Sequence, residues 1–133
     1  MRHIPLLAIV LIIYNAIAFT SSGFLENTVA GFTLPSGAAW SLLGADLLVA
    51  LALFLLYLEI LKATRTSAAS IIDHALSLVI FIICLIQFLL MPAFGTAAFF
   101  MITLITLIDV IAGFTVTISG ARRDVGLDQG MRF

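Results

Sequence analysis

The chain has few charged residues and a single cysteine, and each shortage excludes a class of protein. Charged residues make up 10% of the 133 residues and apolar residues 63%, against about 25% and about 45–50% in ordinary soluble domains. A soluble domain of this length could not bury so much apolar surface in one core. The six basic residues form no continuous face of the kind that binds nucleic acid. Cys84, being alone, cannot form an intrachain disulfide.

Lysine and arginine are also missing from two of the three connections between four long apolar segments. Residues 21–37 and 91–95 contain neither, and the six basic residues flank the other segment ends: Arg2, Lys62, Arg65, Arg122, Arg123 and Arg132. By the positive-inside rule, these ends face the cytoplasm. The sequence therefore predicts an all-α, integral membrane, up-and-down four-helix bundle with both termini cytoplasmic, in the inner membrane of a bacterium.

The four segments predict a single four-span domain over residues 1–133. A transmembrane helix needs about 20 largely apolar residues, which places helices at about 5–20, 38–61, 70–91 and 96–119. Gly120 is expected to end the last helix, leaving a charged tail at 121–133. The connection 21–37 contains Phe24-Leu25-Glu26 and the stretch 29–34, a composition that suits a segment lying at the membrane surface.

The N-terminus allows a second interpretation. Arg2, the apolar stretch 4–14 and Ala16-Ile17-Ala18 have the layout of a secretory signal with a small-residue cleavage site. Cleavage would leave three spans. Apolar character resumes at Phe19, which favours an uncut first helix.

Polar side chains in the spans mark the helix faces that point inward, because hydrocarbon cannot solvate them. On the last helix they recur at steps of three and four, which places them on one face: Thr103, Thr106, Asp109, Gly113, Thr117 and Gly120. Counting 1.5 Å per residue puts four side chains about 6–12 Å below the outer helix ends. These four, Asn15, Asp46, Gln87 and Thr103, are predicted to form one polar layer. Asp109 is expected about 20 Å deep, near the midplane and separate from the layer.

The polar residues can be structural or can form a site. The hydroxyls of Thr103 and Thr106 are expected to bond their own helix backbone, and Asn15 and Gln87 to link helices. Asp46 and Asp109 favour a function, because a carboxylate at depth costs about 2.5–3.5 kcal/mol on insertion scales. Neither has an obvious basic partner at its expected depth, so each is expected to be protonated, wetted or paired with another subunit.

The remaining polar residues carry simpler interpretations. Glu59 and Lys62 are expected to form an interfacial pair, Asp73 to suit the dipole of its helix, and His74 to be structural. No metal-ligand or cofactor motif is found, and no catalytic motif. An enzyme remains the weakest hypothesis, resting on Glu59, Asp73 and His74 converging at one interface.

Two functions fit these features. The first is a small accessory or scaffold subunit that binds the transmembrane helices of other membrane-protein subunits, or of a second copy, within the bilayer. The alternative is a small ion- or proton-coupled transporter or channel using Asp109 and Asp46. Chain length and span number resemble those of the small multidrug-resistance transporters. Their working glutamate on the first helix has no counterpart here, where only Asn15 is present, so no site residue is carried over.

Overall fold

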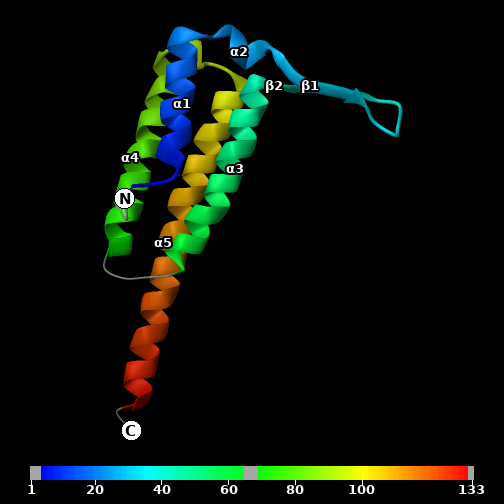
Figure 1. Ribbon diagram of the computed structural model, residues 1–133. Coiled ribbons are helices and arrows are strands. Elements are labelled where there is room, and N and C mark those ends of the chain that lie inside the picture. Colours follow the sequence, from blue (N-terminus) through cyan, green and yellow to red (C-terminus); the bar gives the residue numbers. More distant parts are fainter. Residues whose placement is uncertain (1–3, 65–68, 132–133) are drawn as a thin grey trace.

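The chain folds into a mostly helical structure in which four helices run side by side. The computed structural model describes residues 4–64 and 69–131. In chain order the elements are α1 (Leu7–Thr20), α2 (Gly23–Glu26), β1 (Thr28–Thr33), β2 (Ala39–Leu43), α3 (Gly44–Ala63), α4 (Ala69–Leu90), the 3-10 helix η1 (Pro92–Phe94) and α5 (Ala97–Met131). Helices α1, α3, α4 and α5 form the body, and the β1–β2 hairpin projects from one end of it (Figure 1). We call this the hairpin end, and the opposite end, near Lys62, the lysine end.

Three of the helices are long and apolar enough to cross a membrane. Their apolar stretches are Gly44–Ala63, Ile71–Leu90 and Ala97–Val116, each of 20 residues. Helix α1 is apolar but has only 14 residues. At 1.5 Å per residue it is about 21 Å long, shorter than the roughly 30 Å of a bilayer's hydrocarbon core. The structure is thus consistent with a multi-pass membrane protein and shows that its first apolar helix is the short one.

Helix α3 begins six residues later than the sequence predicts, at Gly44 instead of residue 38. Residues 39–43 form β2, which pairs antiparallel with β1. Trp40 therefore lies in a strand, with its ring centroid 5.0 Å from that of Phe32, and not at the end of a helix. An apolar run of this kind suits either a strand or a helix. The antiparallel pairing with the neighbouring segment 28–33 decides between them.

The last helix continues beyond the predicted end at residue 119, to Met131. Gly120 keeps helical backbone and does not end α5. A glycine inside a helix costs only about 1 kcal/mol relative to alanine, and the alanine and two arginines that follow it are good helix formers. The 35 residues of α5 extend past the other helices at the lysine end (Figure 1).

Aromatic side chains close the interior toward the hairpin end. Tyr14, Phe94 and Phe99 are completely buried. Their ring centroids lie 5.6 Å apart for Tyr14 and Phe94, 4.9 Å for Tyr14 and Phe99, and 5.0 Å for Phe94 and Phe99. These three residues, which we call the aromatic layer, join α1, η1 and α5. The layer lies between the polar interior described below and the hairpin end.

Candidate functional site

Charged and polar side chains from three helices gather in the interior near the lysine end. All but the lysine are at most 8% exposed. The members of this buried polar cluster are Glu59 and Lys62 on α3, Asp73, His74 and Ser77 on α4, and Asp109 on α5. Charged groups inside an apolar helical body are expensive unless they are paired, so their partners decide what the cluster can do.

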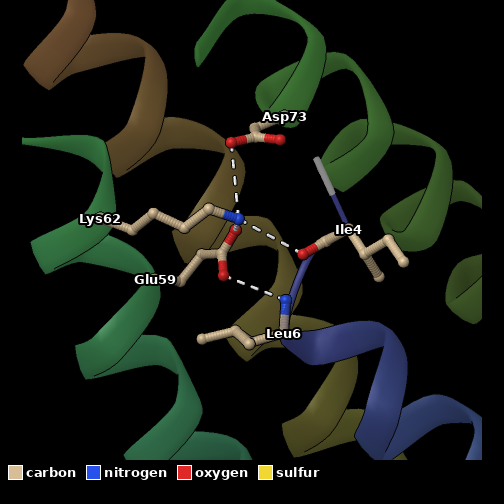
Figure 2. Close-up of polar contacts among 5 residues, drawn as sticks. All are labelled: Ile4, Leu6, Glu59, Lys62 and Asp73. Atoms are coloured by element: carbon tan, nitrogen blue, oxygen red, sulfur yellow. Dashed lines mark hydrogen bonds and ion pairs between the residues drawn. The ribbon is translucent and has the colours of Figure 1, made fainter. Parts of the chain in front are cut away.

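Lys62 links the carboxylates of Glu59 on α3 and Asp73 on α4 (Figure 2). Its Nζ lies 3.4 Å from Asp73 Oδ2 and 3.9 Å from Glu59 Oε1. It also donates a hydrogen bond of 3.3 Å to the backbone carbonyl of Ile4. Counted for the side chain alone, Lys62 is 31% exposed, whereas Glu59 is 6% and Asp73 12% exposed. It therefore connects the buried acids to the surface at the lysine end.

Glu59 also anchors the chain that leads into α1. Its Oε2 accepts a hydrogen bond of 3.0 Å from the backbone N–H of Leu6 (Figure 2). The first N–H groups of a helix lack partners within the helix and carry partial positive charge, so a carboxylate is a favourable acceptor there. The segment Ile4–Leu6 thus lies across Glu59 and Lys62 and covers them.

Asp109 lies inside the cluster but outside its ion pairs. It is 3% exposed, next to Ser77 and close enough to Glu59 and Lys62 for electrostatic interaction. Across residues 4–64 and 69–131 it forms no ion pair. The buried Ser77 hydroxyl completes no hydrogen bond within the same residues. Twelve residues separate Asp109 from the start of α5, or about 18 Å along the axis, so this carboxyl is the deepest acidic group that lacks a basic partner.

His74 packs closely on α5. A Cβ at Gly113 would lie 2.6 Å from the imidazole Nδ1 and 2.7 Å from its Cε1, so only glycine fits there. The ring also contacts Phe114, with centroids 5.5 Å apart. The histidine is therefore buried in the α4–α5 interface, as the structural interpretation of the sequence requires, but it lies beside Asp73 in the cluster.

The hydroxyls between the cluster and the aromatic layer bond their own helix. Thr103 Oγ1 donates to the carbonyl of Phe99 at 2.9 Å, and Thr106 Oγ1 to that of Thr103 at 2.6 Å. Cys84 packs next to Thr106 and is completely buried. These groups are satisfied locally, so Thr103 and Thr106 line the α4–α5 contact without themselves forming a binding site.

A pocket of about 640 Å³ opens at the hairpin end. It lies where α1, α2, α3, η1 and α5 meet, above the aromatic layer. Its polar lining includes Tyr14, Glu26, Asp46 and Thr96. The Tyr14 hydroxyl and Thr96 Oγ1 are 3.0 Å apart. Among the described residues, two carboxylates and no lysine or arginine line the pocket, so it favours a cation over an anion.

The predicted polar layer is only partly assembled. Asn15 and Gln87 pair through two hydrogen bonds, of 3.2 Å from Asn15 Nδ2 and 2.6 Å from Gln87 Nε2. Asp46 does not join them: it lies exposed in the first turn of α3, where Oδ2 accepts from the Leu43 N–H at 3.0 Å. Thr103 is buried between α5 and its neighbours and bonds its own backbone.

The later start of α3 explains why sequence analysis misplaced Asp46. It also explains why Asp109 was not expected beside Glu59, although convergence of Glu59 with Asp73 and His74 was considered. Starting at Gly44, Asp46 is two residues into the helix and Glu59 fifteen, or about 3 Å and about 22 Å. A helix starting at residue 38 would put Glu59 about 32 Å along its axis. The observed depth brings it level with Asp109. One feature of the sequence did indicate the cluster: Glu59 and Lys62 are three residues apart and therefore on one helix face.

No three histidine, cysteine, aspartate or glutamate side chains are grouped to hold a metal ion in the part of the chain that the structure describes. Comparisons with known protein families, with curated proteins and with solved structures find no match for this chain. The functional argument therefore rests on the cluster and the pocket themselves.

Proposed function

We propose that the protein is a small ion- or proton-coupled transporter of a bacterial inner membrane, with Asp109 as the titrating carboxyl. The observation that carries the proposal is the position of Asp109, buried at depth, beside a charged cluster and without an ion pair among the described residues. An ionisable group held in this way inside a membrane protein typically belongs to an ion or proton pathway.

The proposed topology is a four-helix bundle with the lysine end in the cytoplasm. The two connections at the hairpin end, 21–43 and 91–96, contain no lysine or arginine. Lys62 lies at the other end of α3, Arg65 follows it in the sequence, and three further arginines follow the apolar stretch of α5. This distribution satisfies the positive-inside rule. The pocket then opens to the outside.

In this arrangement the pocket is the outer entrance and the buried polar cluster the inner site. Asp46 and Glu26 would attract a cation to the pocket. We take the aromatic layer, which lies between the pocket and Asp109, as the closed gate on this route. Transfer requires Tyr14, Phe94 and Phe99 to separate, and α1, the shortest of the four helices, carries one of these rings. Coupling would arise because Asp109 exchanges its proton for the cation or releases it to the lysine end.

Proton flux in proteoliposomes tests the proposal. An imposed pH gradient, with potassium and valinomycin to set the potential and a trapped pH dye as readout, is expected to drive flux through the wild-type protein. Asp109→Asn keeps the side-chain shape and removes the titrating group, so flux should fall by at least about tenfold. Asp128→Asn, on the same helix beyond its apolar stretch, is the matched control and should leave flux unchanged. Equal flux in wild type and the Asp109 variant, or none in either, would contradict the proposal.

The alternative is an accessory or scaffold subunit that binds partner transmembrane helices. The observation that favours it is the exposure of α4, of whose apolar stretch only 22% is buried, against 39% for α3 and 44% for α5. A stoichiometric partner recovered in mild detergent would support it. The charges argue against it, since Asp109 points inward and Asp46 caps its own helix. Neither needs a basic side chain from another subunit.

A further inference from the structure

The β1–β2 hairpin is the part of the molecule least explained by the helical body. It leaves the hairpin end at a steep angle to the helix axes and extends sideways beyond them (Figure 1). Every residue of β1 is exposed. A single two-stranded hairpin is marginally stable in water, so its surroundings must supply part of its stability.

The hairpin has no charge. Between Glu26 and Asp46 the sequence contains no aspartate, glutamate, lysine or arginine. Soluble proteins usually protect exposed strand edges with charged side chains, especially lysine. Their absence over the whole hairpin indicates that it does not lie in bulk water.

The strand register gives the hairpin two different faces. Residues paired directly across an antiparallel ladder point to the same side, and successive pairs alternate. The pairs Phe32–Trp40 and Ala30–Leu42 form an apolar face, on which the Phe32 and Trp40 rings are in tilted contact, with centroids 5.0 Å apart. The pairs Gly31–Ser41 and Thr33–Ala39 form the opposite face, which is small and partly polar.

The base of the hairpin is fixed at the boundary of the apolar helices. β2 ends at Leu43, and the apolar stretch of α3 starts at the next residue, Gly44. The Gly44 N–H also donates a hydrogen bond of 3.0 Å to the carbonyl of Asn27, just before β1. The base of the hairpin is therefore level with the end of the apolar stretch of α3, where the lipid headgroups would begin.

We propose that the hairpin is a lipid-binding element lying flat in the headgroup region, with the Phe32–Trp40 face toward the acyl chains and the Gly31–Ser41 face toward water. Tryptophan and other aromatic side chains favour this depth, because the ring contacts acyl chains while the polar edge stays hydrated. The free backbone groups of the strand edges meet water and headgroups there, whereas they could not enter the hydrocarbon core. The inference rests on the membrane placement proposed above and not on transport.

Trp40 provides the test, because it is the only tryptophan in the chain. The full-length protein is placed in nanodiscs of phosphatidylcholine, with or without bromine near the top of the acyl chains, and tryptophan emission is measured. We expect the brominated lipid to reduce Trp40 emission at least about twofold more than acrylamide in the water phase does.

Moving the tryptophan gives the matched controls. The variant F32W/W40F keeps it on the same face and should behave as the wild type does. The variant W40F/S41W shifts it by one residue to the opposite face and should reverse the preference, with acrylamide the stronger quencher. If one variant fails to fold, the wild-type measurement and the other variant still decide.

Three results would overturn the inference. Strong acrylamide quenching of Trp40 without bromine quenching would place the hairpin in water. Protection from both quenchers would mean that protein, from a second copy or a partner, covers this face. Equal bromine quenching at positions 40 and 41 would remove the two-sided orientation. Loss of proton flux in the Asp109 variant has no bearing on these readings, so failure of either proposal can be recognised separately.

Discussion

At the scale of single residues, the contact between Gly113 and His74 fixes how closely α4 and α5 approach. The imidazole occupies the space that any larger side chain at position 113 would need. Small residues of this kind allow close packing of apolar helices, where burial from water contributes little to association. The position of His74, and with it that of Asp73, therefore depends on a glycine of the neighbouring helix.

Gly113→Ala is expected to destabilise the helical body. The new Cβ would lie 2.6 Å from His74 Nδ1, and forced repacking of this kind typically costs about 1–3 kcal/mol. The melting temperature in detergent should therefore drop. Gly23→Ala is the control, because a Cβ at Gly23 meets nothing within 4 Å. A Gly113 variant as stable as the Gly23 variant would show that the imidazole moves aside easily.

Residue spacing predicted some of the side-chain partners and missed others. The Asn15–Gln87 pair follows from similar expected depths on two helices, and the structure shows both hydrogen bonds. Proximity of Glu59 to Asp109 could not be predicted, because it depends on where α3 begins. Asp46 was misplaced for the same reason. The sequence placed its carboxylate inside the membrane, but in the structure it caps the N-terminus of α3.

At the scale of elements, α1 is held by polar contacts at its start and in its middle. Glu59 accepts from the Leu6 N–H at its start. In its middle the Tyr14 hydroxyl meets Thr96 Oγ1, and Asn15 pairs with Gln87. A helix of 14 residues offers less packing surface than its neighbours, so these contacts contribute a larger share of its attachment.

Glu59→Ala is expected to loosen the start of α1. A hydrogen bond to a charged group contributes about 1.5–3 kcal/mol, and about 1.4 kcal/mol corresponds to a factor of ten. Hydrogen exchange in a peptide covering the start of α1 should therefore accelerate by at least about tenfold. Glu59→Gln keeps an acceptor and should have a smaller effect. Glu26→Ala, on the exposed end of α2, should leave the exchange unchanged. Unaltered exchange in the Glu59→Ala variant would show that packing alone holds the segment.

The sequence predicted the helices better than their ends. The apolar stretches of α4 and α5 follow directly from composition, because only helices of that length hide their backbone polar groups in lipid. The hairpin was missed because residues 38–43 continue the apolar run of α3 without a break. Their strand conformation depends on pairing with residues 28–33, which local periodicity does not reveal. The prediction that Gly120 ends the last helix was wrong, because a glycine ends a helix only when the backbone turns there.

At the scale of the whole molecule, the placement of lysine and arginine predicts the sidedness of the ends. Ser36 lies exposed at the tip of the hairpin, and Thr64 lies exposed at the end of α3. In the proposed topology these two positions are on opposite sides of the membrane.

Single cysteines at these sites test the topology. With the buried Cys84 replaced by alanine, Ser36→Cys is expected to react with a membrane-impermeant maleimide in intact spheroplasts. Thr64→Cys should react only after the membrane is opened, because the basic flanks keep that end inside. The parent protein without cysteine is the blank. Labelling of Thr64→Cys in sealed spheroplasts would reverse the proposed orientation.

The shortness of α1 has an electrical consequence. Its start lies against the Lys62 side chain, which reaches the surface, and Tyr14 lines the open pocket at the other end. The eight residues from Leu6 to Tyr14 cover only about 12 Å, against roughly 30 Å for a bilayer's hydrocarbon. In the proposed transporter, most of the membrane voltage would fall across this short distance, so a charge moving past Asp109 would cross a steeper field than in the surrounding lipid.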